Sequence, residues 1–291
     1  GVLVAGVAFF TLRYFLHAGE WVVFPGSPHV YSGSNLSSGR VTDRDGVLLL
    51  DSTDGRVYAE DVDIRRATLH LLGDRYGYIS APILEEYADD LVGFNVVNGL
   101  FGQDQGANTA VLSISAQVQK MALQALGNHH GTVGVYNYKT GEILCAVTSP
   151  TYDPDNMPDI EGDETGAYDG VFLNRFFQTS TVPGSIFKIV TAAAALDTLG
   201  DLSQRTFTCN GTWDVNGDTM VCNGTHGTQT LAQAFANSCN IAFGQLALEV
   251  GPETLEAYVE DLGITESLSF DGLTTAAGSF DLSDAVDFEV A

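Results

Sequence analysis

Basic residues are scarce in this 291-residue chain, which carries 12 Lys and Arg against 37 Asp and Glu and has a formal net charge of -25. Only three of the basic residues are lysines, namely Lys120, Lys139 and Lys188. Because binding of a phosphate backbone needs a basic surface, this composition excludes nucleic acid as an expected partner. We interpret the excess of acidic residues as a feature of a soluble surface.

Cysteine is also scarce, and four residues are too few for a disulfide-stapled scaffold. Cys209 and Cys222 flank the turn signal Asn216-Gly217, so we expect a hairpin that brings the two thiols together. Whether they form a disulfide is left open, because that depends on the compartment. His226 lies nearby, but two cysteines and one histidine lack the fourth ligand of a zinc site. We therefore predict no metal and no cofactor.

Long apolar runs are absent except at the start of the chain, where Gly1–Phe10 precedes Arg13. This run is shorter than the roughly 20 residues of a bilayer span. We interpret it as the outer part of a membrane helix, with Arg13, Tyr14 and Trp21 at the interface. A cleaved signal peptide or a buried core helix is the alternative, but no A-x-A cleavage pattern follows. We expect an incomplete membrane anchor over residues 1–24.

The remaining chain predicts a linker, a small mixed domain and then alternating strands and helices. Residues 25–39 are rich in Ser, Gly and Pro and indicate the linker, and residues 40–110 contain short apolar runs broken by glycines. We further expect strands at Ala110–Ile114, Thr132–Tyr138 and Glu142–Ser149, and helices at Ala116–Leu126, Ile186–Leu199, Leu231–Val250 with a break at Asn237–Asn240, and Glu253–Leu262. The helix over Ile186–Leu199 is rich in alanine and is expected to be buried.

An acidic segment over Asp153–Asp169 superficially matches a calcium loop. The match fails because Pro158 stands where such a loop requires glycine. We therefore expect a solvated surface loop.

The segment Pro183-Gly184-Ser185-Ile186-Phe187-Lys188 leads a serine into the first turn of the alanine-rich helix, with a lysine three residues later. Positions i and i+3 share one helix face, about 5–6 Å apart at Cβ, so Lys188 can reach the Ser185 hydroxyl. A neutral lysine can remove the proton of a serine if burial lowers the pKa of the amine. The alternative is a surface lysine on a helix that begins with a serine cap.

A second candidate is Ser238-Cys239-Asn240, which lies in the break of a helical region. Hydroxyl and amide groups two residues apart on a non-helical turn can point into one cleft. A triplet of this kind by itself is typical of a helix cap. Together with Ser185 and Lys188, however, it predicts a serine acyl-transfer site.

These motifs resemble those of the penicilloyl-serine transferases, whose signature comprises S-x-x-K, S-x-N and K-T-G. Within that superfamily the chain most resembles class B penicillin-binding proteins. The resemblance is carried by Gly39–Gly46 for the opening of the pedestal, Leu112–Gln119 and Gly131–Asp155 for the first part of the transpeptidase domain, and Asn174-Arg175 with Pro183-Gly184-Ser185 for the approach to the nucleophile. It implies an α+β fold with three parts. These are the anchor, a linker and non-catalytic pedestal over residues 25–110, and a transpeptidase domain over residues 111–291 with an antiparallel sheet packed between helices.

Carried onto this chain, the resemblance implies a serine D,D-transpeptidase in which Ser185 is acylated and Lys188 is the general base. Ser238 would relay a proton to the leaving group, and Asn240 would orient the substrate amide or the lysine. The oxyanion hole would use the backbone N–H of Ser185 and one from the K-T-G strand. The implied partners are peptidoglycan stem peptides, lipid-linked precursor strands, β-lactams as covalent inhibitors and a glycosyltransferase in the membrane. The implied location is the cell membrane, crossed once, with the catalytic domain on the extracytoplasmic side.

The K-T-G triplet is where the sequence departs from the family. Its only occurrence, Lys139-Thr140-Gly141, precedes Ser185, whereas the catalytic triplet of the family follows S-x-N. We predict that it is a hairpin turn without a catalytic role. Because no such triplet follows Asn240, we expect a C-terminally truncated fragment that is inactive by itself.

Other classes of protein fit less well. A class A β-lactamase would need a deacylating Glu near an Asn, and no Asn follows Asn240. A bifunctional class A penicillin-binding protein would need a glycosyltransferase domain, for which residues 25–110 are too few. An unrelated serine hydrolase is disfavoured because the chain has no G-x-S-x-G elbow. A non-catalytic scaffold or a β-lactam sensor with the same fold is the alternative from another functional class.

Overall fold

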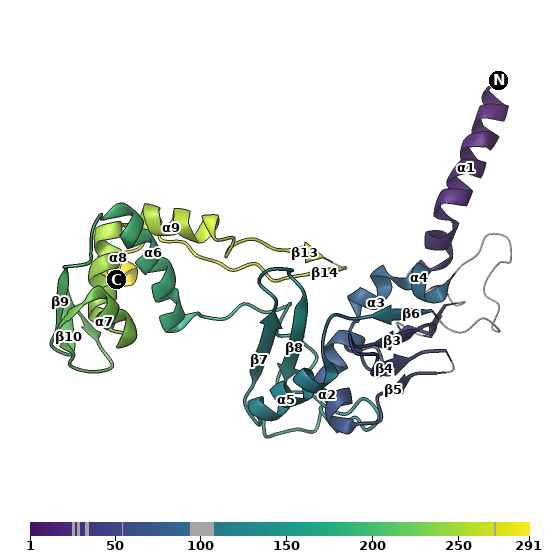
Figure 1. The fold of residues 1–291 in the computed structure, drawn as a ribbon, viewed down its shortest axis with the longest axis horizontal. Helices are drawn as coiled ribbons and strands as arrows, with labels where there is room; N and C mark the ends of the chain where they lie inside the picture. The colour runs from purple at the N-terminus through teal and green to yellow at the C-terminus, as the bar shows by residue number, and fades with distance from the viewer. Residues whose placement is uncertain (25–26, 28–29, 33–34, 54, 94–107, 271) are drawn as a thin grey trace. The chain divides into compact units, whose positions relative to one another are not determined.

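The apolar N-terminal residues form one helix, α1 (Val2–Val22), in the computed structural model, which describes residues 1–24, 27, 30–32, 35–53, 55–93, 108–270 and 272–291 (Figure 1). At 1.5 Å per residue its length is about 31 Å, close to the roughly 30 Å of a bilayer core. An 18-residue window of this helix has a mean hydropathy of 1.5, and 6% of that window is buried inside the structure. By length and composition the helix can therefore span a membrane. The helix continues beyond the apolar run Gly1–Phe10 and through Arg13, since arginine is a good helix former. The anchor over residues 1–24 stays a prediction.

The chain divides into two compact units, Gly1–Thr179 with Ser269–Thr275, and Ser180–Leu268 with Ala276–Ala291. Each unit contains both helices and strands, and the predicted α+β class is confirmed. The division falls after Thr179 because the strands that follow residue 130 pack on helices of the first unit. The functional domain limits at residues 24 and 110 stay a prediction.

Four short strands of the first unit form a sheet in the order β5-β4-β3-β6. They are β3 (Arg40–Thr42), β4 (Leu48–Asp51), β5 (Val57–Tyr58) and β6 (Thr109–Val111), and the sheet is mixed, since β3 pairs antiparallel with β4 and parallel with β6. Buried Leu49 and Leu50 of β4 share one core with apolar side chains of the helices α2 (Val62–Leu72), α3 (Pro82–Glu86) and α4 (Ala88–Val92).

The described residues of 25–39 are folded, which corrects the predicted linker. The short strands β1 (Tyr31–Ser32) and β2 (Asn35–Leu36) pair antiparallel, and Val30, Tyr31 and Leu36 are buried in the core of the first unit. These three apolar side chains attach the described part of the segment to that core. The rest of this segment (25–26, 28–29 and 33–34) and residues 94–107 of the expected pedestal lie outside the described residues.

The predicted helix Ala116–Leu126 is confirmed as α5 with the same limits, and it packs with α2 against the antiparallel pair β7 (Gly131–Tyr136) and β8 (Ile143–Ser149). Gln119 of α5 is fully buried and joins the three elements. Its Nε2 donates to the carbonyl of Ala67 at 3.1 Å, and its Oε1 accepts the N–H of Ala146 at 2.7 Å. Antiparallel strands therefore do pack against helices here, in a two-stranded sheet.

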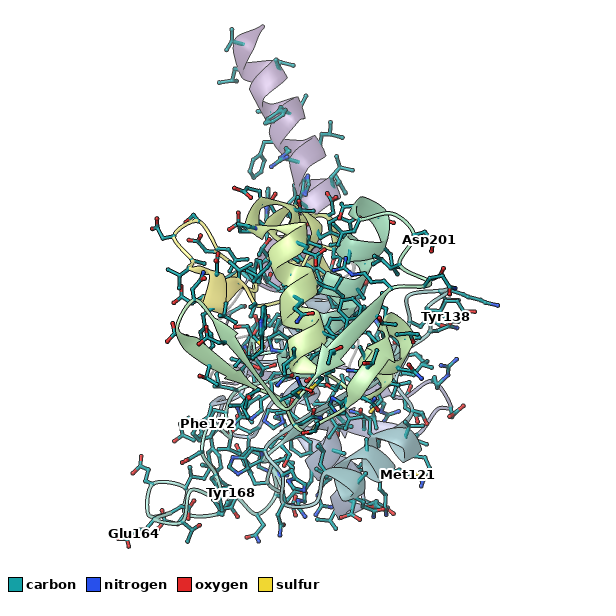
Figure 2. The ribbon with its side chains drawn as sticks, turned by 90° about the vertical axis from the view of Figure 1, so that its left-hand side faces the viewer. Met121, Tyr138, Glu164, Tyr168, Phe172 and Asp201 are labelled. Atoms are coloured by element: carbon teal, nitrogen blue, oxygen red, sulfur yellow. The ribbon has the colours of Figure 1, made fainter. Side chains whose placement is uncertain are left out.

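The acidic segment 153–169 is a loop, as predicted, and Glu164 points away from the chain (Figure 2). Arg65 of α2 holds its start by donating to both carboxylate oxygens of Asp153 at 2.8 Å. Met157 and Ile160 pack against a small apolar cluster at its base. The loop is thus anchored by side chains. The strands β13 (Ser269–Phe270) and β14 (Leu273–Thr274) complete the first unit.

The second unit packs the helices α6 (Lys188–Thr198), α8 (Asn240–Val250) and α9 (Pro252–Asp261) together. Its strands form two antiparallel pairs, β9 (Thr206–Cys209) with β12 (Gly227–Thr230) and β10 (Thr212–Val215) with β11 (Asp218–Val221). Shorter helical segments are η1 (Gly184–Phe187), α7 (Leu231–Ala236) and α10 (Asp287–Val290). The hairpin predicted at Asn216-Gly217 is confirmed as the turn between β10 and β11.

Only one face of α6 is buried, whereas the sequence predicts a buried helix. Ala194 and Ala195 are fully buried against neighbouring helices, whereas Ile189 and Leu196 are 59% and 55% exposed. The small alanines allow α8 to approach closely, and this approach brings the residues after α7 near Lys188.

Candidate active site

Ser185 lies in the 3₁₀ turn η1, immediately before α6 begins at Lys188. Gly184 adopts a φ of 55°, a left-handed conformation that glycine reaches without a steric penalty. The chain therefore turns sharply into the helix, and Ser185 is solvent-exposed at that turn. An exposed serine at the N-terminus of a helix is accessible to a substrate and lies in the positive end of the helix dipole.

Lys188 brings all four predicted site residues together. Its Nζ lies 3.0 Å from Ser185 Oγ, 2.9 Å from Asn240 Oδ1 and 3.4 Å from Ser238 Oγ. The amine thus lies within hydrogen-bond distance of three oxygen atoms, which come from η1, from α8 and from the turn between α7 and α8. The Ser185 contact follows from the i, i+3 spacing, whereas the other two cross about 50 residues of sequence.

The turn between α7 and α8 positions Ser238 and Asn240. Ser238 has a φ of 50°, which is uncommon for a residue with a side chain and marks a constrained backbone. Its N–H donates to Phe235 O at 3.0 Å, and the N–H of Cys239 donates to Ala234 O at 2.9 Å. This reversal ends α7 and starts α8 at Asn240. The Nδ2 of Asn240 donates to Val221 O at 3.1 Å, which leaves Oδ1 facing Lys188.

Burial lowers the pKa of the Lys188 amine, although nearby Cys222 and Cys239 oppose the shift. Its hydrogen-bond partners Ser185, Ser238 and Asn240 are neutral, and none of the salt bridges among the described residues involves Lys188. A carboxylate in that position would stabilise the ammonium. The lowered pKa therefore makes the neutral amine of Lys188 easier to reach than that of an exposed lysine, and the neutral amine is the form that can accept a proton from a serine hydroxyl.

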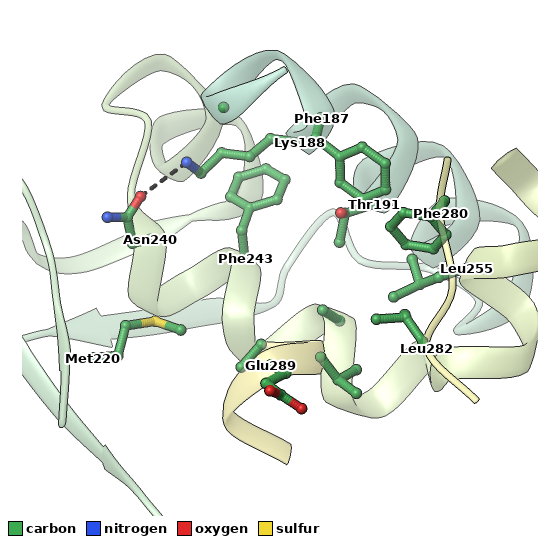
Figure 3. Close-up of a pocket in the computed structure, with 14 residues that line it drawn as sticks. Phe187, Lys188, Thr191, Met220, Asn240, Phe243, Leu255, Phe280, Leu282 and Glu289 are labelled. Carbon is green, nitrogen blue, oxygen red and sulfur yellow. Dashed lines mark hydrogen bonds between the residues drawn. The ribbon is translucent and has the colours of Figure 1, made fainter. Parts of the chain in front are cut away.

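A pocket with a volume of about 320 Å³ lies beside Lys188 and Asn240 and extends along α8 (Figure 3). Its wall is largely apolar and includes Phe187, Phe243 and Phe280, and the rings of Phe187 and Phe280 stack with centroids 5.0 Å apart. Lys188 and Asn240 are hydrogen-bonded to each other on one side of it (Figure 3). Such a pocket suits an apolar group next to a polar reacting centre.

The triplet Lys139-Thr140-Gly141 lies in the turn between β7 and β8, as the sequence predicts. The N–H of Lys139 donates to Asn137 Oδ1 at 3.0 Å, and Gly141 adopts a φ of 80°. Both features are those of a hairpin turn. The triplet belongs to the first compact unit, whereas the four candidate site residues belong to the second.

The cysteines are free thiols in this structure, so Cys209 and Cys222 are not joined by a disulfide. Sequence reasoning placed these two near His226 and found no fourth partner. The structure adds Cys239, the central residue of the Ser238-Cys239-Asn240 triplet, to the same cluster. Proximity in the chain did not indicate it, because Cys239 follows His226 by 13 residues and reaches it through the start of α8.

Comparisons with known proteins agree on one family. Residues 131–288, more than half of the chain, match the penicillin binding protein transpeptidase domain. The peptidoglycan D,D-transpeptidase PbpA of Mycolicibacterium smegmatis is 29% identical over 202 residues, which cover 62% of this chain and 41% of that protein. This chain thus spans less than half the length of that curated relative.

Two solved structures resemble the fold. One is the D,D-transpeptidase domain of a peptidoglycan glycosyltransferase from Eggerthella lenta, with a TM-score of 0.68, 27% identity, and coverage of 87% of this chain and 59% of that chain. The other is penicillin-binding protein A of Mycobacterium tuberculosis as a penicillin G acyl-enzyme complex, with a TM-score of 0.59, 26% identity, and coverage of 78% and 59%.

Proposed function

Because the chain belongs to the family of penicillin-binding protein transpeptidase domains, we propose that it carries the acylation centre of a class B peptidoglycan D,D-transpeptidase, with Ser185 as nucleophile. The observation that carries the proposal is the position of Lys188 Nζ, 3.0 Å from Ser185 Oγ and 2.9 Å from Asn240 Oδ1. This geometry provides a base for a serine whose hydroxyl is otherwise a poor nucleophile.

In the first step the neutral amine of Lys188 accepts the proton of Ser185 Oγ while Oγ attacks the carbonyl carbon between the two terminal D-alanines of a stem peptide. The backbone N–H of Ser185 donates to the developing oxyanion. When the tetrahedral intermediate collapses, the C–N bond breaks and the leaving amine takes up a proton. Ser238, 3.4 Å from Lys188 Nζ, is placed to relay that proton from the lysine.

In the second step an amine of another stem peptide attacks the acyl-enzyme, and the new amide cross-links two strands while Ser185 regains its proton. A β-lactam mimics the donor peptide and stops at the acyl-enzyme stage. Penicillin-binding protein A of Mycobacterium tuberculosis, a relative in fold, is known as such a penicillin G complex. Asn240 fits a role in orienting Lys188, since its side chain is itself held by Val221 O.

Helix α1 supports a cell-membrane location, and we include in the proposal a single span with the catalytic part on the extracytoplasmic side, where peptidoglycan is built. Residues 1–24 then form the anchor and interface, 25–110 the pedestal region and 111–291 part of the transpeptidase domain. Lipid-linked precursor strands supply the stem peptides, and a glycosyltransferase in the same membrane is the fitting partner.

The test is covalent labelling of the intact gene product, expressed in its membrane, by a fluorescent penicillin. We expect Ser185→Ala to abolish labelling and Lys188→Ala to slow it about 10²- to 10⁴-fold, the usual contribution of a general base. Lys139→Ala, which removes the exposed lysine of the hairpin turn, is the matched control and should label like the wild type. Equal labelling of Ser185→Ala and wild type would refute the proposal and favour a non-catalytic scaffold.

A further inference from the structure

Three thiols and one imidazole converge in the second unit, next to the turn that carries Ser238 and Asn240. Cys209 ends β9, Cys222 follows β11, His226 precedes β12 and Cys239 caps the N-terminus of α8. One ligand atom from each of the four residues lies within 4.8 Å of the others. The three cysteines are buried and His226 is half-buried.

We propose that these four residues bind one Zn²⁺ ion in a tetrahedral Cys₃His site. With Zn–S bonds of about 2.3 Å and a Zn–N bond of about 2.0 Å, a tetrahedron has S–S edges of about 3.8 Å and S–N edges of about 3.5 Å. Cys222 Sγ lies 3.8 Å from Cys239 Sγ and 3.7 Å from His226 Nδ1. Two edges of the cluster therefore lie within about 0.2 Å of the lengths that zinc requires.

The chemistry of the donors selects the ion. Thiolate and imidazole groups in a closed, four-coordinate arrangement suit Zn²⁺, whereas Mg²⁺ and Ca²⁺ prefer oxygen ligands. The sequence spacing is C-x12-C-x3-H-x12-C, and both Cys209 and Cys222 are followed by Asn-Gly-Thr. The backbone N–H of Asn240 donates to Cys222 Sγ, and such a donor stabilises a metal-bound thiolate.

Binding of the zinc ion replaces three thiol protons. Three S–H bonds break and three protons leave to solvent, while three Zn–S bonds and one Zn–N bond form with the lone pairs of the thiolates and the neutral imidazole. The site then carries a net charge of -1 from one Zn²⁺ and three thiolates. No oxidant is involved. A disulfide, by contrast, would use two cysteines, require an oxidant and leave the other two groups unpaired.

The ion would fix the turn that places Ser238 and Asn240. Cys239 is the residue between them, and the N–H of Asn240 donates to Cys222 Sγ at 3.3 Å. Zinc would thus tie the start of α8 to β9 and to the residue after β11, so that Asn240 is held through its backbone as well as its side chain. We assign Cys239 and its partners as positioning residues, because they act through Ser238 and Asn240.

Metal content of the purified 291-residue chain tests the site without requiring activity. The chain is purified in detergent under reducing conditions, incubated with ZnCl₂, desalted and analysed by elemental mass spectrometry. We expect one zinc per chain in the wild type. Cys209→Ala should weaken zinc binding at least about tenfold and retain less than one zinc per chain after desalting, since even loss of a partner that only supports a ligand costs about 10- to 100-fold in metal affinity. Co²⁺ in place of Zn²⁺ should give the visible absorption of a tetrahedral thiolate complex.

Cys145→Ala is the matched control, because Cys145 is a buried cysteine of β8 that belongs to another cluster of side chains. It should retain one zinc. A folded wild-type chain that holds no zinc would overturn the proposal, whether or not Cys209→Ala folds. Equal zinc in Cys209→Ala and wild type would do the same. A thiol titration distinguishes zinc from a disulfide. The wild-type chain is purified without reductant, denatured and freed of zinc, and four thiols are expected. A result of two thiols would overturn the proposal in favour of a disulfide.

Hydrogen exchange tests the positioning role on the wild-type chain alone. We expect the amides of residues 239–242 to exchange more slowly with zinc than after chelation, while α5 in the other compact unit stays unchanged. Zinc binding with equal exchange of residues 239–242 in both states would refute the positioning role.

Discussion

Replacing Asn240 with aspartate should alter the acid–base behaviour of Lys188 more than it alters the fold. Asn240 Oδ1 is 2.9 Å from Lys188 Nζ, so Asn240→Asp places a full negative charge beside the amine with almost no change in side-chain volume. The charge stabilises the ammonium and raises the pKa of Lys188, which burial otherwise lowers. At neutral pH less of the lysine is then available as a base.

The distance sets the scale of the effect. Two unit charges 2.9 Å apart interact by about 6 kcal/mol at an effective dielectric constant of about 20. Measured pairs of a carboxylate and a cation show less, with pKa changes of about 1 to 3, because water and mobile side chains screen the charges. Lys188 is only partly buried, so we expect the lower part of that range. Acylation by penicillin at pH 7 should fall about 10- to 100-fold.

The assay is the rate of acylation of the intact gene product as a function of pH. For Asn240→Asp the rate should rise with pH and approach the wild-type rate once Lys188 is deprotonated, because only the protonation equilibrium has changed. The substitution also removes the hydrogen bond from Nδ2 to Val221 O, and a loss of geometry would lower the rate equally at all pH values. Such a uniform loss, or an unchanged pH profile, would refute the reasoning. Asn137→Asp makes the same substitution in the turn between β7 and β8 and serves as the control, with an acylation rate like that of the wild type.

Two further predictions concern stability. Burial of the imidazole lowers the pKa of His70 from 6.5 to about 4, while its ring Nε2 contacts Val171 O at 2.7 Å. Above pH 6.5 the imidazole of His70 is neutral in both the folded and the unfolded chain, and it does not lower stability. As the pH falls from 6.5 to 4, the unfolded chain binds a proton that the folded chain does not, and the free energy of unfolding decreases. We expect a loss of about 3 kcal/mol over that range, measured by urea unfolding. His70→Gln should flatten this pH dependence, and an unchanged slope would contradict the assignment. Thr230→Ala removes the capping box of α7 and should lower stability by about 1 kcal/mol, whereas Thr228→Ala on the exposed face of β12 should change it little.

Local features were predictable from the sequence because they depend on neighbours in the chain. The helix Ala116–Leu126 has the limits that its apolar periodicity indicates, and the turns at Asn216-Gly217 and Lys139-Thr140-Gly141 lie where the turn residues place them. Local composition was misleading where distant residues determine the structure. Residues 25–39 have the composition of a linker, yet three of their apolar side chains are buried in a core formed by distant residues.

The contact between Ser185 and Lys188 was determined by sequence alone, since an i, i+3 pair in the first turn of a helix shares one face. Tertiary structure decided the rest of the site. Ser238 and Asn240 reach Lys188 only because the alanine-rich face of α6 packs against α8, and no periodicity within either segment encodes that approach. The same packing gives Cys239 its place beside Cys209, Cys222 and His226. Short-range geometry follows from the backbone itself, whereas the meeting of remote groups depends on which apolar surfaces bury one another.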